Sequence, residues 1–130
     1  MLVWHSQTPD WFFKENFDPN GAWVSKDKMT KRLENYIKTV METLKKDYPD
    51  VEFYAWDVVN EAASDAGTIR DAGSNNEVNG QSAWVKVYGD QSYIPLAFEF
   101  AKKYAPAGCK LFYNDYNEYS PNLSLIHISE

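Results

Sequence analysis

The chain has 130 residues with 19 acidic and 13 basic side chains, so its formal net charge is −6 at neutral pH. This length suits one globular domain, the acidic balance argues against a nucleic-acid partner, and no run approaches the roughly 18 apolar residues of a membrane-spanning helix. A single cysteine, Cys109, excludes an internal disulfide framework and a multi-cysteine zinc site. The first residues lack a basic segment followed by a long apolar stretch, so we expect no signal peptide in this chain.

The first half of the chain predicts a strand, a long helix and a second strand. Residues 2–5 form a short apolar run that ends at turn chemistry, which predicts a buried strand. Apolar residues then recur on one helical face over residues 28–46, with Ser25 or Asp27 as the candidate N-cap. Residues 51–59 follow as a second strand, and its nearly continuous apolar second half is typical of a strand buried on both faces.

The second half predicts a long loop, a helix and a third strand. Glycine and asparagine turn signals recur over residues 62–89, and a loop of this length is usually functional or decorated with short helices. Residues 92–104 carry a helical apolar face with Pro95 in the first turn, and residues 109–114 form the third strand. Most of the aromatic side chains are expected to pack in the core, among them Phe53, Tyr54, Phe98 and Phe112.

Strands that alternate with helices indicate an α/β protein with a parallel sheet, whose helices we expect on one side. In such folds the site lies at the carboxyl ends of the strands. Polar side chains follow each predicted strand: His5 and Gln7, then Asn60 and Glu61, then Asn114 and Asn117. The pattern therefore nominates a site at this edge, and we expect Trp4, Glu61 and Asn114 to converge there, but it does not name the chemistry.

Glu61 is the most informative of these residues. A carboxyl group ringed by tryptophan and valine is expected to hold its proton tightly, because burial disfavours the anion. That property suits a general acid at neutral pH. A glutamate that caps the next element or pairs with a base is the alternative, and the residues alone leave both open.

Three segments resemble motifs of glycoside hydrolase family 10, the xylanase family. Residues 56–62, Trp-Asp-Val-Val-Asn-Glu-Ala, resemble its acid/base signature. Residues 2–11 are similar to its third-strand motif, and residues 111–117 to its fifth-strand motif. The resemblance covers residues 1–122 and implies an α/β fragment of a (β/α)8 TIM barrel. The fragment would run from about the third to the fifth strand of that barrel, with the helices between them. Residues 123–130 depart from the family and are expected to be an atypical C-terminal tail.

The resemblance implies hydrolysis of internal β-1,4-xylosidic bonds in xylan by a retaining double displacement. It makes Glu61 the general acid/base and Asn60 the partner of a sugar 2-hydroxyl, with Trp4 lining the same subsite. The other substrate-binding residues that it implies are His5 as a neighbouring support, Gln7, and Tyr116 and Asn117 near the leaving-group sugars. Retention also needs a second carboxylate about 5 Å from the first. In the family this nucleophile lies on a later strand, so we expect it to be absent from this chain.

Two alternatives remain beside the enzyme fragment: a non-catalytic sugar-binding remnant of the same barrel, and an α/β piece whose motif likeness has lost its function. The expected partner is xylan or a xylo-oligosaccharide, with no nucleic acid and no membrane. We expect no cofactor and no metal, because residues 71–75 fail the calcium-loop pattern and His5, His127 and Cys109 lack zinc spacing. Secretion is the family expectation for a polymeric substrate.

Overall fold

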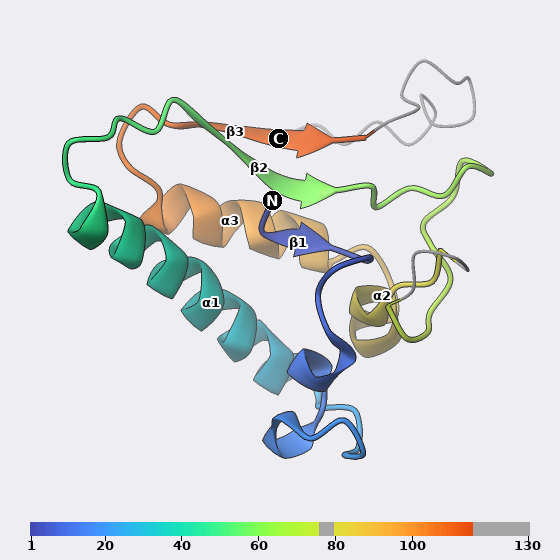
Figure 1. Ribbon diagram of the computed structural model, residues 1–130. Coiled ribbons are helices and arrows are strands. Elements are labelled where there is room, and N and C mark those ends of the chain that lie inside the picture. Colours follow the sequence, from blue (N-terminus) through green and yellow to red (C-terminus); the bar gives the residue numbers. More distant parts are fainter. Residues whose placement is uncertain (76–79, 116–130) are drawn as a thin grey trace.

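A three-stranded parallel sheet organises the protein in the computed structural model, which describes residues 1–75 and 80–115 (Figure 1). The strands β1 (Val3–Trp4), β2 (Ala55–Asn60) and β3 (Lys110–Asn114) lie in the order β1-β2-β3. Both pairings are parallel. The predicted order of elements and the parallel sheet are therefore confirmed. The expectations for Tyr116, Asn117, His127 and the tail at 123–130 lie outside the described residues.

Two strands are shorter than predicted. The second strand begins at Ala55 rather than at residue 51, and the first spans two residues instead of four. Ala55 pairs with Lys110, the first residue of β3, so residues 51–54 lie before the start of the neighbouring strand. Tyr54 is accordingly 70% exposed. The prediction started the second strand too early because it relied on the apolar residues of the segment, whereas the partner strand pairs only from Ala55 onward.

The long helix α1 (Lys26–Asp47) lies close to the predicted range of residues 28–46. The structure also decides between Ser25 and Asp27 as its N-cap. The Ser25 side-chain oxygen accepts a hydrogen bond from the Lys28 backbone N–H at 3.2 Å, so Ser25 is the N-cap. Residues four apart form the buried face of the helix: Met29, Leu33, Ile37 and Met41. This apolar stripe holds α1 against the rest of the core.

Two further helices complete the described part of the chain. The loop expected over residues 62–89 contains a short helix, α2 (Ala83–Tyr88), whose N-cap is Ser82. The helix α3 (Tyr93–Tyr104) matches its predicted range. Its buried residues are Tyr93, Ile94, Ala97, Phe100 and Ala101. This face is rotated from the predicted one, so that Phe98 is only partly buried at the edge of the core.

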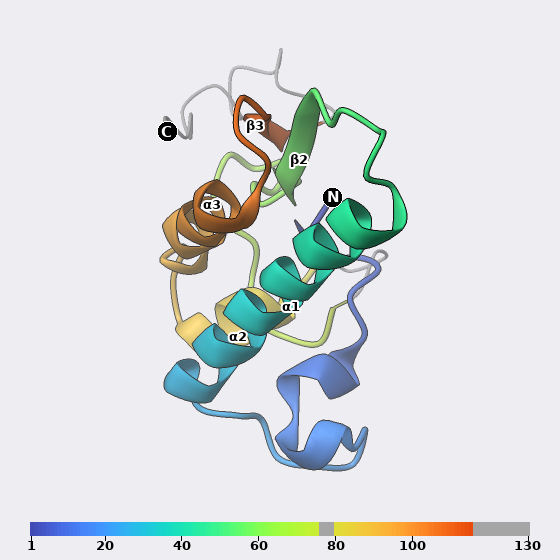
Figure 2. The same cartoon turned by 90° about the vertical axis from the view of Figure 1, so that its left-hand side faces the viewer.

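The helices and the sheet form two layers. Figures 1 and 2 show α1 and α3 packed side by side on one side of the sheet, as expected. No helix of the described residues covers the other face of the sheet. The expectation that Tyr54 and Phe112 pack in the core is wrong, because Tyr54 is 70% exposed and Phe112 is 45% exposed.

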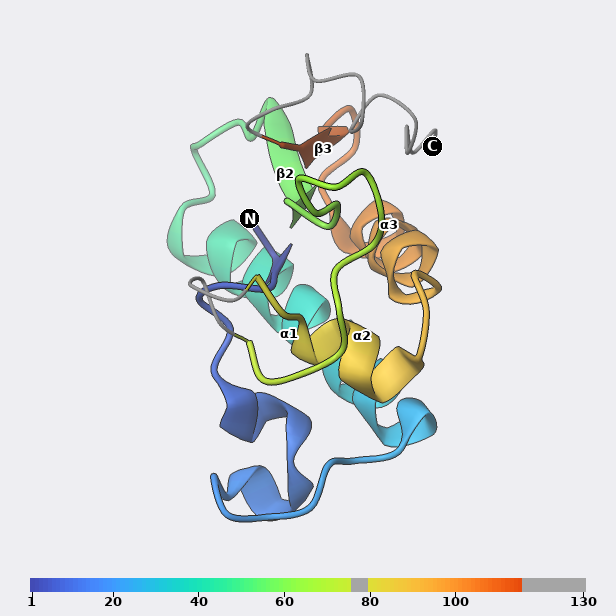
Figure 3. The ribbon, with the colours of Figure 1, turned by 90° about the vertical axis from the view of Figure 1, so that its right-hand side faces the viewer.

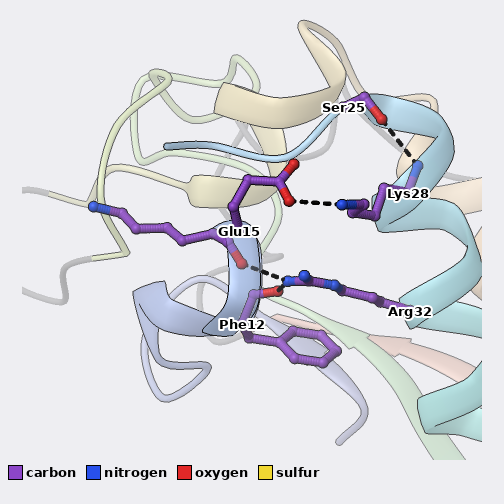
Figure 4. A network of polar contacts seen from close by, with 6 residues as sticks. Phe12, Glu15, Ser25, Lys28 and Arg32 are labelled. Atoms are coloured by element: carbon purple, nitrogen blue, oxygen red, sulfur yellow. Dashed lines mark hydrogen bonds and ion pairs between the residues drawn. The ribbon is translucent and has the colours of Figure 1, made fainter. Parts of the chain in front are cut away.

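Polar contacts tie the segment after β1 to the start of α1 (Figure 4). This segment forms two short 3-10 helices, Asp10–Phe13 and Glu15–Phe17. The Arg32 guanidinium donates to the carbonyls of Phe12 and Lys14 at 2.8 Å each, and Lys28 forms an ion pair with Glu15 at 2.6 Å. The connection that leaves the sheet at Trp4 is thus anchored before it enters the helix layer.

We predict that the isolated 130-residue chain self-associates in solution. The outer edges of β1 and β3 have no strand partner in the described sheet, and large apolar side chains such as Phe112 are exposed. Free strand edges and apolar patches both promote association. Sedimentation velocity should show species larger than a monomer, with a broad thermal transition. A monomer with a sharp cooperative melt would contradict this prediction.

Candidate active site

Glu61 follows β2 directly and has a left-handed backbone conformation, with φ at 49°. This conformation costs a residue with a side chain about 1–2 kcal/mol. Hydrogen bonds on both sides hold it: the Glu61 N–H donates to the Asn114 carbonyl at 2.8 Å, and the Glu61 carbonyl accepts from Arg70 Nε at 2.6 Å. The strained turn points to a functional role for this residue, because such strain tends to persist at functional sites.

The side chain of Glu61 meets Trp4, the last residue of β1. Trp4 Nε1 donates to Glu61 Oε2 at 3.2 Å. The backbone of Trp4 is fixed from the core, because the buried Trp84 indole donates to the Trp4 carbonyl at 3.2 Å. Trp84 in turn packs edge-on against Phe13, with ring centroids 4.7 Å apart. The carboxyl group is therefore positioned by an indole that the hydrophobic core holds in place.

Asn60 lies between the ends of the two outer strands and is only 2% exposed. Its register partners are Trp4 on β1 and Asn114 on β3. In one orientation of its amide, the oxygen accepts from Asn114 Nδ2 at 2.8 Å. In the other, the oxygen accepts from Trp4 Nε1 at 3.1 Å and the nitrogen donates to the Asn114 carbonyl at 3.1 Å. The structure thus brings Trp4, Glu61 and Asn114 together around a buried amide.

His5 is buried behind this group, at 5% exposure, with its ring edge-on to Trp4 at 6.2 Å. Its Nδ1 atom has no hydrogen-bond partner among the described residues. Burial, reinforced by the positive charge of Arg70, lowers the pKa of His5 to about 4, although the charge of Asp115 opposes this. The imidazole is therefore neutral at pH 7, which fits a supporting position rather than a proton donor.

Gln7 is exposed in the turn after β1, and no described contact ties it to Glu61. Figure 3 views the carboxyl ends of the strands, and the segment that follows β2 lies on this side of the molecule.

Within residues 1–75 and 80–115, no three His, Cys, Asp or Glu side chains gather in a way that could hold a metal ion. None of the helices in these ranges is both long and apolar enough to cross a bilayer.

Sequence reasoning missed two residues that hold the site together. Arg70 lies in the loop after β2, is 8% exposed and donates to both the Glu61 and the Gly80 carbonyls. Gly80 has φ at 68°, and a Cβ there would lie 2.8 Å from the Arg70 guanidinium. No pattern in the sequence marks this arginine. Tyr113 lies in the predicted strand of residues 109–114, and sequence reasoning assigned it no role.

A parallel sheet with carboxylate and amide side chains at its carboxyl ends is the arrangement found in barrel enzymes that act on sugars. The family model for glycosyl hydrolase family 10 matches residues 1–127. The chain belongs to this family, and it is a fragment of the TIM-barrel fold of its structural neighbours.

The relatives show how large that fragment is. The chain is 57% identical over 122 residues to endo-1,4-beta-xylanase Y of Acetivibrio thermocellus, covering 91% of this chain and 11% of that protein. It is 53% identical to a bifunctional endo-1,4-beta-xylanase of Ruminococcus flavefaciens, covering 92% of this chain and 12% of the relative. The chain therefore spans about a tenth of the length of these two relatives.

Solved structures agree. The N-terminal endo-1,4-beta-D-xylanase 10B of Clostridium thermocellum, complexed with xylohexaose, superposes with a TM-score of 0.90 at 51% identity, covering 95% of this chain and 25% of that one. An endo-1,4-beta-xylanase from Caldicellulosiruptor owensensis gives a TM-score of 0.71 at 41% identity, covering 95% and 32%.

We predict that His5 makes the fold sensitive to acid. Its pKa of about 4 lies below the ordinary histidine pKa of 6.5, so the unfolded chain binds the proton more readily than the folded chain does. The stability is fully present above pH 6.5 and is lost as the pH falls toward 4, by at most about 3 kcal/mol. An NMR titration should show one histidine resonance with a midpoint near 4, assigned to His5 with a His127→Asn variant. A His5 midpoint near 6.5 would contradict the prediction.

Proposed function

We propose that this chain supplies the acid/base half of a site that hydrolyses internal β-1,4-xylosidic bonds in xylan with retention of configuration. The observation that carries the proposal is the 3.2 Å hydrogen bond from Trp4 Nε1 to Glu61 Oε2 at the carboxyl ends of parallel strands. It joins a carboxyl group, which a glycosidase needs as its acid, to a flat aromatic side chain that can line a sugar subsite. Family membership and the xylanase names of the relatives support the reaction class.

In the proposed mechanism, Glu61 protonates the glycosidic oxygen as the bond to the leaving sugar breaks. After the leaving sugar departs, the same carboxylate accepts a proton from the water that hydrolyses the covalent intermediate. The Asn60 amide binds the 2-hydroxyl of the sugar under attack, a hydrogen bond that strengthens in the transition state. Trp4 lines the same subsite, and the neutral His5 supports the Trp4 ring from behind.

The nucleophile of this mechanism comes from outside the chain. Among the described residues, Asp115 is another carboxylate near the strand ends, but its Oδ2 accepts a hydrogen bond from the Tyr113 hydroxyl at 2.8 Å. It is thus engaged by a residue of β3. We propose that β1, β2 and β3 are the third, fourth and fifth strands of the barrel, and that residues 1–122 are the part of the catalytic domain present here. A later strand would then carry the second carboxylate.

We propose that the substrate is xylan or a xylo-oligosaccharide, since the Clostridium thermocellum neighbour is complexed with xylohexaose. In this proposal Gln7, Tyr116 and Asn117 contact sugars on either side of the cleaved bond. We also propose that the reaction takes place outside the cell, because the substrate is a polymer. One matched structure is described as an intracellular xylanase, so fractionation of the source cells is the test that decides the compartment.

We predict that the purified 130-residue chain has no measurable activity on xylan. Glu61 can protonate a leaving oxygen, but the retaining route also needs a nucleophile to form the covalent intermediate. Reducing-sugar release from xylan at high protein concentration is the measurement. Robust hydrolysis by the chain alone would overturn the claim that its nucleophile lies elsewhere.

We predict that a complete barrel restores activity and that Glu61→Gln then removes most of it. Residues 1–122 would replace the matching segment in the xylanase domain of the Acetivibrio thermocellus relative, which is 57% identical. Glutamine keeps the shape of the side chain but has no acidic proton, so kcat/KM on xylan should fall by about 10²- to 10⁴-fold. The control is Glu42→Gln, on the exposed side of α1.

An aryl xyloside separates the acid role from a general loss of function. Its activated leaving group needs little protonation, so Glu61→Gln should affect its glycosylation step less than it affects xylan. Equal losses on both substrates at that step would argue against Glu61 as the acid. A folded chimera that binds xylo-oligosaccharides without cleaving them would favour the sugar-binding remnant instead.

A further inference from the structure

The hydroxyl group of Tyr113 lies against the turn that follows Glu61. The backbone N–H groups of Ala62 and Ala63 donate to Tyr113 Oη at 3.0 and 3.3 Å. The same hydroxyl donates to Asp115 Oδ2 at 2.8 Å. A tyrosine hydroxyl offers one proton and accepts up to two hydrogen bonds, so this group uses its full capacity at a single turn.

Hydrogen bonds hold one peptide group through both its N–H and its carbonyl. The Glu61–Ala62 peptide donates through the Ala62 N–H to Tyr113, while its carbonyl accepts from Arg70 Nε at 2.6 Å. The preceding N–H, that of Glu61, is held by the Asn114 carbonyl at 2.8 Å. Because the peptide groups on both sides of the Glu61 Cα are held, the left-handed φ of 49° is held as well.

The direction of the carboxyl group depends on this backbone. If φ at Glu61 returned to the common right-handed or extended regions, the Cα–Cβ bond would turn and the Oε2 atom would leave Trp4 Nε1. Ala62 and Ala63 are both buried, so water is a poor substitute for the tyrosine oxygen. The turn therefore needs a polar group from the neighbouring strand, and Tyr113 supplies it.

The charge state of Tyr113 suits this task. Burial, the hydrogen bond to Asp115 and the negative charge of Asp115 raise the pKa of the phenol above its usual range. The hydroxyl thus keeps its proton at neutral pH. A hydroxyl that donates to a carboxylate is polarised, and this makes its oxygen a better acceptor for the two N–H groups.

We propose that Tyr113 is a positioning residue for the acid/base: its hydroxyl fixes the Glu61–Ala62 peptide and thereby aims the Glu61 carboxyl at the leaving-group oxygen. The inference rests on the proposed role of Glu61 and goes beyond it. Tyr113 touches no reacting atom in this scheme. It acts on the reaction only through the turn that carries Glu61.

The test is Tyr113→Phe in the chimera described above, which keeps the ring and removes the oxygen. Misplacement of the acid should lower kcat on xylan by about 10- to 100-fold while KM changes by less than about twofold. On an aryl xyloside with an activated leaving group, glycosylation should slow by less than about threefold, since that step needs little protonation. The split between the two substrates is a readout that a loss of stability alone would not produce.

Tyr88→Phe is the matched control. The Tyr88 hydroxyl is hydrogen-bonded to Thr30 Oγ1 at 2.8 Å in the helix layer, away from Glu61. Its removal should lower the Tm in a similar way but leave both activities within about twofold of the parent chimera. A Tyr113→Phe chimera that behaves like the Tyr88→Phe control, or that loses activity equally on both substrates, would overturn the inference.

Two further outcomes keep the inference distinct from the proposed function. If the parent chimera cleaves xylan and Glu61→Gln abolishes cleavage while Tyr113→Phe does not slow it, only the inference fails. An inactive but folded parent overturns the proposed function, and the inference fails with it.

If the Tyr113→Phe chimera does not fold, hydrogen exchange in the parent chimera tests the inference. The Ala62 and Ala63 amides should exchange at least about 100-fold more slowly than free amides, and unprotected exchange would overturn the inference.

Discussion

The register in which β2 pairs with its two neighbours determines the arrangement of the site. Asn60 is the direct partner of Trp4 on one side and of Asn114 on the other, so three strand ends meet at one level. Glu61, the next residue, then reaches Trp4 with its side chain and Asn114 with its backbone. A slip of one residue in either pairing would separate these groups, because alternate residues of a strand face opposite sides of the sheet.

That register contains an irregularity that local patterns could not reveal. The pairing of β2 with β3 shifts between Asp57 and Val59, so β2 has one residue more than β3 over this stretch. The extra residue behaves like a bulge, a feature common next to active sites, where it redirects side chains. It allows Asn60 to pair with Asn114 rather than with the following residue, and it leaves the last three residues of β2 buried in succession. The site therefore depends on a pairing detail that exists only once two strands lie together.

The sequence predicted what depends on local pattern and failed where distant partners decide. The order of strands and helices, the long helix and the polar residues after each strand all follow from periodicity and turn chemistry. The start of β2 was placed too early because its length is set by where β3 begins, at Lys110. Arg70 and Tyr113 were missed for the same kind of reason. Their roles come from carbonyl and N–H groups that the fold brings to them across at least nine and fifty residues of chain, respectively.

The strand ends around Glu61 are held by contacts made within the chain. Trp84 fixes Trp4 from the core, and Asn75 links the loop after β1 to α2, donating to the Thr8 carbonyl at 2.8 Å and accepting from the Ala83 N–H at 2.7 Å. Tyr113 and Arg70 hold the turn after β2. None of these bonds requires a residue beyond the described ranges. In the proposed mechanism the rest of the barrel would then add the second carboxylate and the remaining sugar contacts, while the aim of the first carboxylate is set by the three strands themselves.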